Sequence, residues 1–166
     1  GLDLTGTSGV LESCVFSENS GPGILLSAAQ PTLVNCLVTG NASGGIDVTQ
    51  GSTPTLANCV VADNSRGGVN GGGILCAVGH PELTNCIVWV NLPNSIGLEG
   101  ASSLSAVHSC LEVLTPWPGT GNINQDPRFC GWGSLKEVYV DAAHPGPGDG
   151  SAASPFPSLV EALAYS

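Results

Sequence analysis

The chain has 166 residues with 42% hydrophobic content, which suits a folded domain with a sizeable core rather than a disordered segment. Thirteen acidic residues against three basic ones give a formal net charge of −10, which excludes nucleic-acid binding and disfavours anionic membrane surfaces. No apolar run approaches the roughly 20 residues needed to span a bilayer, so no membrane insertion is expected. Glycine is abundant, with 24 residues, whereas aromatic residues make up 5%, which favours an all-β class with tight turns.

A repeat of 22 to 27 residues runs through most of the chain, and cysteine marks its register. Four of five equivalent cysteines are followed five positions later by asparagine, and an aliphatic residue stands three positions before each cysteine. The cysteines are Cys14, Cys36, Cys59, Cys86 and Cys110, the asparagines are Asn19, Asn41, Asn64 and Asn91, and the aliphatic residues are Leu11, Leu33, Leu56, Leu83 and Val107. A hydrophobic residue also stands two positions after each cysteine until Glu112 breaks the series. Self-similarity at such a period predicts stacked repeats.

In chain order, each unit predicts a short apolar strand near the cysteine, an asparagine-containing turn, a glycine-rich stretch and another short strand, as at residues 23–26 and 73–76. The unit at 54–80 is four residues longer than the unit at 31–53, and we expect its glycine-rich excess at 67–73 to bulge out as a loop. Because no unit can bury a core alone, the units are expected to stack as coils of parallel sheet about 4.8 Å apart.

Stacked coils predict ladders of equivalent side chains. The cysteine and leucine ladders would fill the interior, while the asparagines would bond backbone groups at a bend and tolerate a left-handed conformation. Stacked cysteines have parallel Cβ vectors about 5 Å apart, wider than the roughly 3.8 Å of a disulfide, so we expect five buried reduced thiols. Cys76 and Cys130 lie off this ladder.

Two other repeat classes share a similar period. Helical repeats need two amphipathic segments of about ten residues or more in each unit, and the sequence contains none. Leucine-rich repeats need several leucines at fixed offsets, which are missing as well. The period and the strand signals together therefore favour a coil of parallel sheet.

The motif Leu-Xaa-Asn-Cys-Xaa-Val-Xaa-Xaa-Asn occurs at residues 33–41, 56–64 and 83–91, and the first unit carries Ser13 in place of the asparagine before cysteine. This motif resembles the repeat of right-handed parallel β-helix proteins of the pectate-lyase-like superfamily. The segment at 121–129 is similar to the closing segment of many such domains. The resemblance covers most of residues 8–130 and implies a right-handed parallel β-helix, or solenoid, of about five coils.

The tail at residues 138–166 resembles the opening of a new β-helix domain, which in the family is a strand, a glycine-rich loop and a capping helix over the first coil. Ser158 and Glu161 have capping-box spacing, and apolar residues around them recur at helical spacing. The residues expected to form the strand and the cap contact are Val138, Tyr139, Val140, Phe156, Leu159 and Leu163. We therefore predict coils and a closing segment at residues 1–133 and a cap-like module at 134–166.

A short helix that needs a partner and a first coil without a cap are complementary. In head-to-tail assembly, residues 138–166 would cover the first coil of the next copy and produce a fibre or open array. In the alternative, the tail folds back onto its own coil and the chain is a monomer. The order of the two modules also implies tandem β-helix domains in a longer parent polypeptide. The lack of methionine and of a leader at residue 1 suggests an internal or processed fragment.

The resemblance brings polysaccharide lyases into consideration, which combine a carboxylate cluster and calcium with a basic residue. The available bases are Arg66, Arg128 and Lys136. The acids Asp47, Asp63 and Glu82 do not share an offset in the repeat, so the sequence predicts no carboxylate cluster and favours solvated surface acids. No enzymatic activity is established by these residues.

Other ligand signals are weak. Asp141, Asp149 and the glycines between 146 and 150 offer oxygen ligands to calcium, although a plain turn fits them as well. Zinc is not expected, because no cysteine pair has zinc-site spacing and the histidines are isolated. These histidines are His80 at a unit boundary, His108 in a strand and His144 in the tail. Trp89, Trp117 and Trp132 either stack on sugar rings or pack at the core and rim.

Two functions remain. The first is a structural or adhesive module, secreted or on the cell surface, whose partners are other copies or tandem domains of the same protein. The second is a carbohydrate-active or carbohydrate-binding domain whose polysaccharide site lies partly outside this fragment. The fold alone cannot choose between them. A groove with carboxylates and aromatic residues along one sheet face would favour the second function, and exposed coil ends would favour the first.

Overall fold

The computed structural model describes residues 1–68 and 70–129 of the chain. The chain divides into two compact units, and the first, Gly1–Pro127, holds every strand of the described part. Of the second unit, Arg128–Ser166, only residues 128 and 129 are described. The predicted cap-like module at 134–166, with its expected strand and capping helix, lies outside the described residues.

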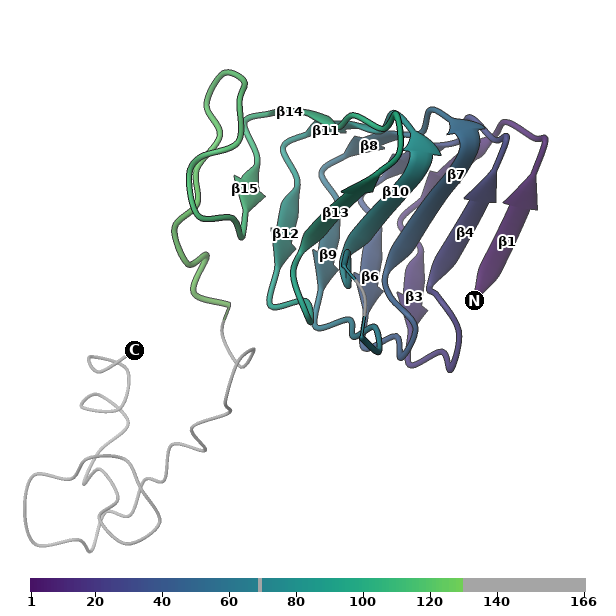
Figure 1. The fold of residues 1–166 in the computed structure, drawn as a ribbon, viewed down its shortest axis with the longest axis horizontal. Coiled ribbons are helices and arrows are strands. Elements are labelled where there is room, and N and C mark those ends of the chain that lie inside the picture. The colour runs from purple at the N-terminus through teal and green to yellow at the C-terminus, as the bar shows by residue number, and fades with distance from the viewer. Residues whose placement is uncertain (69, 130–166) are drawn as a thin grey trace, which may run out of the picture. The chain divides into compact units, whose positions relative to one another are not determined.

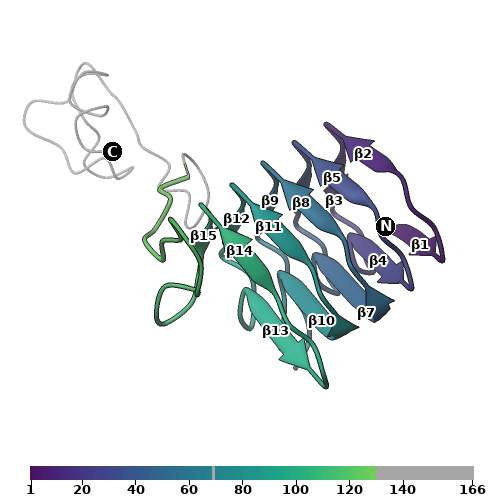
Figure 2. The same ribbon diagram turned by 90° about the horizontal axis from the view of Figure 1, so that it is seen from above.

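Short strands wind into three parallel sheets of five strands each, and successive coils lie side by side in Figures 1 and 2. Sheet A contains β1 (Leu2–Thr5), β4 (Ile24–Ser27), β7 (Ile46–Ser52), β10 (Ile74–Gly79) and β13 (Ile96–Glu99). Sheet B contains β2 (Val10–Glu12), β5 (Thr32–Val34), β8 (Thr55–Ala57), β11 (Glu82–Thr84) and β14 (Ser105–Val107). Sheet C contains β3 (Val15–Ser17), β6 (Leu37–Thr39), β9 (Val60–Ala62), β12 (Ile87–Trp89) and β15 (Cys110–Leu111). One strand from each sheet makes a coil, and the predicted all-β solenoid of about five coils is confirmed.

The corners between the sheets use left-handed backbone. Between sheets B and C, the residue before each cysteine of the motif has a φ near +54°, as at Asn35, Asn58 and Asn85. Asparagine tolerates this conformation better than other non-glycine residues, which explains why the motif carries Asn-Cys. Ser13 and His108 hold the same corner in the first and fifth coils, with φ values of 53° and 50°.

The second asparagine of the motif behaves differently from our expectation. At the corner between sheets C and A, the left-handed residue is the one before the asparagine, as at Gly40, Asp63 and Val90. Asn41, Asn64 and Asn91 themselves point inward and are buried, with at most 2% of each residue exposed. The left-handed tolerance predicted for these asparagines is therefore wrong, because the bend is made one position earlier and frees the amide to bond inside.

Rows of equivalent aliphatic side chains fill the interior. The fully buried members are Ile24, Ile46 and Ile74 with Leu26 and Val48 in sheet A, Leu33, Leu56 and Leu83 in sheet B, and Val38, Val61 and Val88 in sheet C. Cys76 occupies the row of Val48, which explains why it lies off the cysteine ladder. Burying each such Leu, Ile or Val side chain contributes roughly 1.5–3 kcal/mol.

The fifth coil is shifted by one residue against the sequence repeat. Cys110 pairs with Ile87, and Leu111 pairs with Val88, so Ser109 takes the position that Cys86 holds one coil earlier. In sheet B, Ala106 pairs with Leu83. The prediction that Cys110 and Val107 continue the cysteine and leucine ladders is therefore wrong. The hydrophobic pattern decides this register, because the shift turns Leu111 into the core instead of Glu112.

The longer third unit carries its extra residues where we expected them. Six residues separate β6 from β7, whereas eleven separate β9 from β10. The extra segment contains the glycines at 67, 68 and 71–73, and it leaves the pairing of β10 with β7 intact from Ile74 to Ala77. Sheet A thus continues past the insertion, and only the connection between sheets C and A is lengthened.

Candidate functional site

Asparagine forms a continuous hydrogen-bonded ladder inside the corner between sheets C and A. The Oδ1 atom of Asn64 accepts from both the backbone N–H and the side-chain Nδ2 of Asn41, at 3.1 and 2.8 Å. The Oδ1 atom of Asn91 accepts from the same two groups of Asn64, each at 3.0 Å, and Asn41 accepts from those of Asn19. The remaining amide hydrogens bond backbone carbonyls such as those of Val38 and Ala62. The predicted bonding of these asparagines to backbone groups is confirmed.

The two ends of the asparagine ladder differ. At the first coil, the Gly1 amino group donates to Asn19 Oδ1 at 2.8 Å. At the fifth coil, Asn91 Nδ2 lies 3.3 Å from Ser95 Oγ, which in turn donates to Glu112 Oε2 at 2.7 Å. Glu112, which breaks the sequence repeat, thus ends the ladder with an ionisable acceptor. Sequence reasoning noted the break but did not find this role.

A column of cysteine side chains lies inside the corner between sheets B and C. Cys36, Cys59 and Cys86 are each at most 2% exposed, whereas Cys14 in the first coil is half-buried. Each Sγ atom lies near the carbonyl two residues earlier, as for Cys59 and Ala57 at 3.3 Å. Ser109 continues this column, since its Oγ donates to the carbonyl of Val107 at 2.9 Å and accepts from the N–H of Cys86 at 3.0 Å.

The six cysteines among the described residues all carry free thiols, and Cys130 lies outside that part. Cys110 lies outside the column, with its Sγ 3.1 Å from the carbonyl of Gln125 in the closing segment. Cys76 is fully buried in sheet A between Val48 and Leu98. Cys76 therefore has no cysteine in the paired positions of its neighbouring strands.

The environment of these thiols changes their acidity. Burial raises the pKa of Cys76 to about 12, with a smaller contribution from the nearby Asp47 carboxylate. In the column, the hydrogen bond from Cys86 lowers the pKa of Cys59 to about 7, and the same bond together with burial raises the pKa of Cys86. The acidity of each of these two thiols therefore depends on the other thiol.

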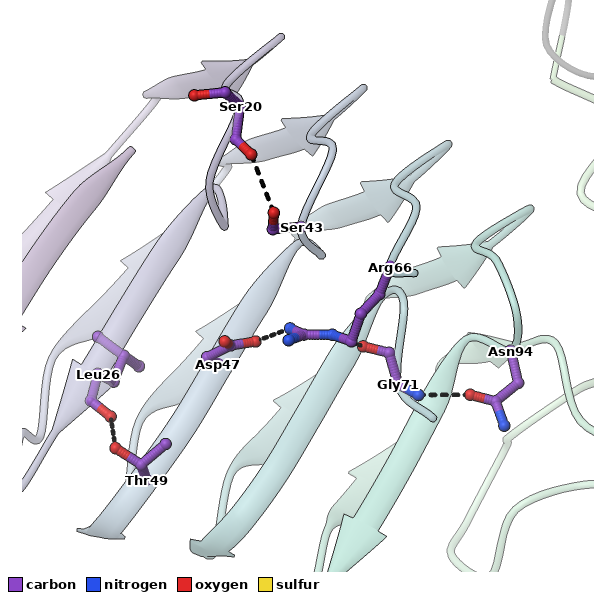
Figure 3. A network of polar contacts seen from close by, with 8 residues as sticks. All are labelled: Ser20, Leu26, Ser43, Asp47, Thr49, Arg66, Gly71 and Asn94. Atoms are coloured by element: carbon purple, nitrogen blue, oxygen red, sulfur yellow. Dashed lines mark hydrogen bonds and ion pairs between the residues drawn. The ribbon is translucent and has the colours of Figure 1, made fainter. Parts of the chain in front are cut away.

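An ion pair crosses the outer face of sheet A and ties down the glycine-rich insertion (Figure 3). The Arg66 guanidinium contacts the Asp47 carboxylate, and its Nε donates to the carbonyl of Gly71 at 3.3 Å. Gly71 in turn donates from its N–H to Asn94 Oδ1 at 2.5 Å. Gly44 has a φ of 103°, which other residues rarely adopt, and a side chain there would displace the Arg66 guanidinium.

Asp47 lies between two leucines on this face, because Leu25 and Leu75 hold the equivalent positions of the adjacent coils. Burial raises the pKa of the Asp47 carboxyl above its ordinary value, although the Arg66 charge and hydrogen bond oppose this shift. The candidate base Arg66 and the candidate acid Asp47 are therefore partners of each other. Their offsets in the repeat differ, so the sequence alone did not pair them.

The other candidate residues do not come together. Asp63 lies at a left-handed corner, Glu82 lies on sheet B, and both are exposed. Among the described residues there is no group of three or more His, Cys, Asp or Glu side chains that could hold a metal ion. Lys136, Asp141, His144 and Asp149 lie outside the described residues. The calcium prediction therefore stays a prediction.

The histidines and tryptophans of the described part have separate positions. His80 is exposed and bonds Ser103 Oγ at 2.8 Å. His108 lies at a corner and not in a strand, contrary to our expectation, because the fifth coil bends at this residue. Trp89 is half-buried on β12, and Trp117 packs against the core and donates from Nε1 to the carbonyl of Leu104 at 3.1 Å. Trp132 lies outside the described residues.

The closing segment pairs with the fifth coil. Ile123 forms a parallel bridge with Cys110. Asn122 Oδ1 accepts from the N–H of Ser109 at 3.0 Å, and Asn122 Nδ2 donates to the carbonyl of Ala106 at 2.7 Å. One side chain thus satisfies both a donor and an acceptor of the last coil.

A groove of about 410 Å³ runs along the outer side of this corner. Its polar lining includes Asn58, Asn85 and His108, which follow one another at the equivalent position of three coils. Its apolar lining includes Val60 and Ile87 of sheet C and Ile123 of the closing segment. Gly121 passes so close to the His108 ring that a side chain on it would collide.

The first coil has an open side in the described residues. Its strands β1, β2 and β3 are the terminal members of the three sheets. Leu4, Leu11 and Phe16 are half-buried there, whereas their equivalents one coil later, such as Leu26 and Leu33, are fully buried. A hollow of about 380 Å³, lined in part by Phe16, lies beside this coil.

Comparison with known proteins gives one family. The family model described as the right-handed β-helix region matches residues 1–111. Because this match covers more than half of the chain, the chain belongs to the right-handed β-helix family. Neither the curated proteins nor the solved structures contain a match to this sequence. The described residues form no helix long and apolar enough to cross a membrane.

Proposed function

We propose that this β-helix domain is a structural or adhesive module, secreted or on the cell surface, that associates head to tail with other copies or tandem domains of the same protein. The observation that carries the proposal is the coil-to-coil pairing, which repeats through all three sheets from β15, β14 and β13 to β3, β2 and β1. The paired backbone edges and the apolar rows that join every later coil continue up to β1, β2 and β3, where the inward side chains are only half-buried. Sheet edges and apolar rows of this kind can pair with further strands, whether these come from a tandem domain or from another copy.

The proposed occupant of the open coil is the segment 138–166 of another copy. This segment contains the apolar strand pattern Val138-Tyr139-Val140 and the helical pattern that includes Phe156 and Leu163. Both match the strand and cap that the family resemblance implies for the start of a β-helix. A repeating contact between two different surfaces of the same molecule produces an open array.

Sedimentation velocity over a concentration series tests the assembly. We expect the average mass of the full chain to rise with concentration, and we expect Phe16→Gln in the first coil, or Phe156→Gln with Leu163→Gln in the tail, to prevent this rise. Ile123→Gln is the matched control, because Ile123 is 49% exposed at the opposite end of the solenoid. A full chain that stays monomeric at every concentration would contradict head-to-tail assembly.

The location is tested separately. In cells that produce the parent polypeptide, a protease added outside intact cells should remove the domain from the surface, or the domain should be found in the medium. Recovery of the domain only after lysis would contradict the secreted or cell-surface location. This result would leave the assembly proposal intact, since assembly is measured on the purified chain.

A second candidate function is carbohydrate binding, and the outer groove is the observation that favours it. Amide and imidazole groups of Asn58, Asn85 and His108 stand beside the apolar side chains of Val60 and Ile87, a combination that suits the hydroxyls and apolar faces of sugars. The negative charge of the chain favours neutral polysaccharides over acidic ones.

Isothermal titration with neutral oligosaccharides tests the carbohydrate proposal. We expect Asn85→Ala and His108→Ala each to weaken binding about tenfold or more, which corresponds to loss of roughly 1.4 kcal/mol. Asn35→Ala is the matched control, since Asn35 has the same corner position but does not line the groove. Equal affinities in all three variants would rule out this groove as the binding site.

A further inference from the structure

The cysteine column concentrates sulfur along one line of the core. Cys14, Cys36, Cys59 and Cys86 hold the same position in four successive coils, as shown by the hydrogen bonds from Leu37, Val60 and Ile87 to the carbonyls of the first three, each at 2.9 Å. Neighbouring strands of a sheet lie about 4.8 Å apart, so each sulfur has another sulfur at about that distance above or below it.

The column offers two sulfur ligands in a line. Two metal–sulfur bonds of about 2.3 Å laid end to end span about 4.6 Å, close to the strand spacing of about 4.8 Å. A ligand set of this kind suits soft monovalent ions with linear two-fold coordination. It does not suit Zn²⁺, which requires four ligands in a tetrahedral arrangement, and no group of three or more metal-ligating side chains exists among the described residues.

We propose that the cysteine column is a binding site for a soft monovalent metal ion of the Cu(I) class, held linearly between the sulfurs of Cys59 and Cys86. The ion displaces the proton of one of the two thiols, which leaves to solvent as the metal–sulfur bond forms. The other thiol keeps its proton and donates a lone pair to the metal. The site therefore stays electrically neutral in the core, and no atom changes its oxidation state.

The position of the pair in the fold supports this assignment. Cys59 and Cys86 are each 1% exposed, so the apolar surroundings exclude water and favour a neutral complex over a charged one. Both residues also line the outer groove, so the pair lies beneath a surface that solvent reaches.

Silver(I) is the probe for the test, because it shares the linear coordination of Cu(I) and is not oxidised by air. The full-length chain, reduced and free of oxygen, is titrated with Ag⁺, washed with excess glutathione and analysed by native mass spectrometry. We expect the chain to retain one silver ion and to release one proton for each ion bound. No retained silver after the glutathione wash would overturn the proposal.

Serine variants separate the column from the other thiols. Cys59→Ser should lower silver retention at least tenfold, and it should fold, because Ser109 already holds the same position in the fifth coil. Cys76→Ser, Cys110→Ser and Cys130→Ser should retain silver as the unmodified chain does. The proposal is overturned if Cys59→Ser retains silver equally, or if any of the three control variants loses it.

Discussion

Asparagine serves two different purposes in each coil. Before the cysteine it takes the left-handed corner and stays exposed, as Asn58 and Asn85 do. Five positions after the cysteine it is buried, and its amide joins one coil to the next, as Asn64 does. No buried side-chain nitrogen or oxygen in the described residues lacks a hydrogen-bond partner, so the ladder asparagines cost little despite their burial.

Substitution of a ladder asparagine should therefore be far more costly than substitution of a corner asparagine. Asn64→Ala removes Oδ1, which accepts from the N–H and the Nδ2 of Asn41, and it removes Nδ2, which donates to two backbone carbonyls and to Asn91. We expect it to lower the free energy of unfolding by roughly 2–4 kcal/mol. Asn85→Gly is the matched control and should change stability by less than about 1 kcal/mol, because glycine adopts the left-handed corner freely. Urea unfolding measures both, and equal losses would contradict the distinction.

The buried thiol of Cys76 should make stability depend on alkaline pH. Its folded-state pKa of about 12 lies above the ordinary value of 9.0, so the folded state keeps the proton that the unfolded state loses. The stabilisation is complete below the ordinary thiol pKa and is lost as pH rises through the interval up to about 12. Cys76→Val should reduce this alkaline loss, which urea midpoints at about pH 8 and about pH 10.5 would reveal. An unchanged difference between the two midpoints would contradict the assignment.

At the scale of the element, the insertion between β9 and β10 is held by one ion pair. Arg66 reaches both the Asp47 carboxylate on β7 and the Gly71 carbonyl inside the insertion. The Arg66 and Asp47 side chains are only 14% and 15% exposed, so this pair is more shielded from water than a typical surface salt bridge. Loss of the arginine would leave a half-buried carboxylate among leucines.

Arg66→Gln should loosen the insertion without disrupting the sheets. We expect cleavage within residues 67–73 by a protease of broad specificity to become several-fold faster, and stability to fall by roughly 1–3 kcal/mol. Asp47→Asn combined with Arg66→Gln should recover part of the lost stability, because the unpaired carboxylate is then absent. Mass spectrometry of the first cleavage products identifies the site. Unchanged cleavage within 67–73 would show that the ion pair does not hold this segment.

The fifth coil shows how one element departs from its repeat. Its strand β15 is shifted so that Leu111 enters the core, while Ser109 substitutes for a cysteine and Glu112 reaches Ser95. The closing segment then satisfies the last coil through Asn122. The change of register thus coincides with the point at which the ladders end.

At the scale of the whole molecule, each coil contacts only its neighbours, so stability should vary along the solenoid. The middle coils have a paired coil on both sides, whereas the first coil is paired on one side only. Hydrogen exchange followed by mass spectrometry should therefore find the slowest-exchanging amides in β5 and β8 of sheet B and in β6 and β9 of sheet C. Exchange should be faster in β1 to β3. A uniform rate along the coils would contradict this expectation and indicate fully cooperative opening.

Association would change this pattern in a specific way. If another copy covers the first coil, exchange in β1 to β3 should slow as the protein concentration rises, while exchange in the middle coils stays the same. Protection of the middle coils instead would locate the contact elsewhere. The measurement therefore connects the stability of the open coil to the proposed assembly.

The sequence by itself determined the parallel coil architecture, because the period is marked by residues whose roles are set within their own coil. The Leu-Xaa-Asn-Cys motif specifies an inward leucine, a left-handed corner and an inward thiol within four consecutive residues, so Cys36, Cys59 and Cys86 could be aligned without a structure. The insertion at 67–73 was visible for the same reason, as a change in spacing between otherwise matching units.

Only the tertiary structure decided the contacts between residues that hold different positions in their repeat units. The pairing of Arg66 with Asp47, the closure of the asparagine ladder by Glu112 and the removal of Cys110 from the cysteine column each depend on how coils lie against one another. A one-residue shift reverses the face of every side chain in a strand, and core packing of Leu111 selects that shift. The sequence motif determines that each unit forms a coil. The free energy of packing between coils determines the strand register and which side chains make contact.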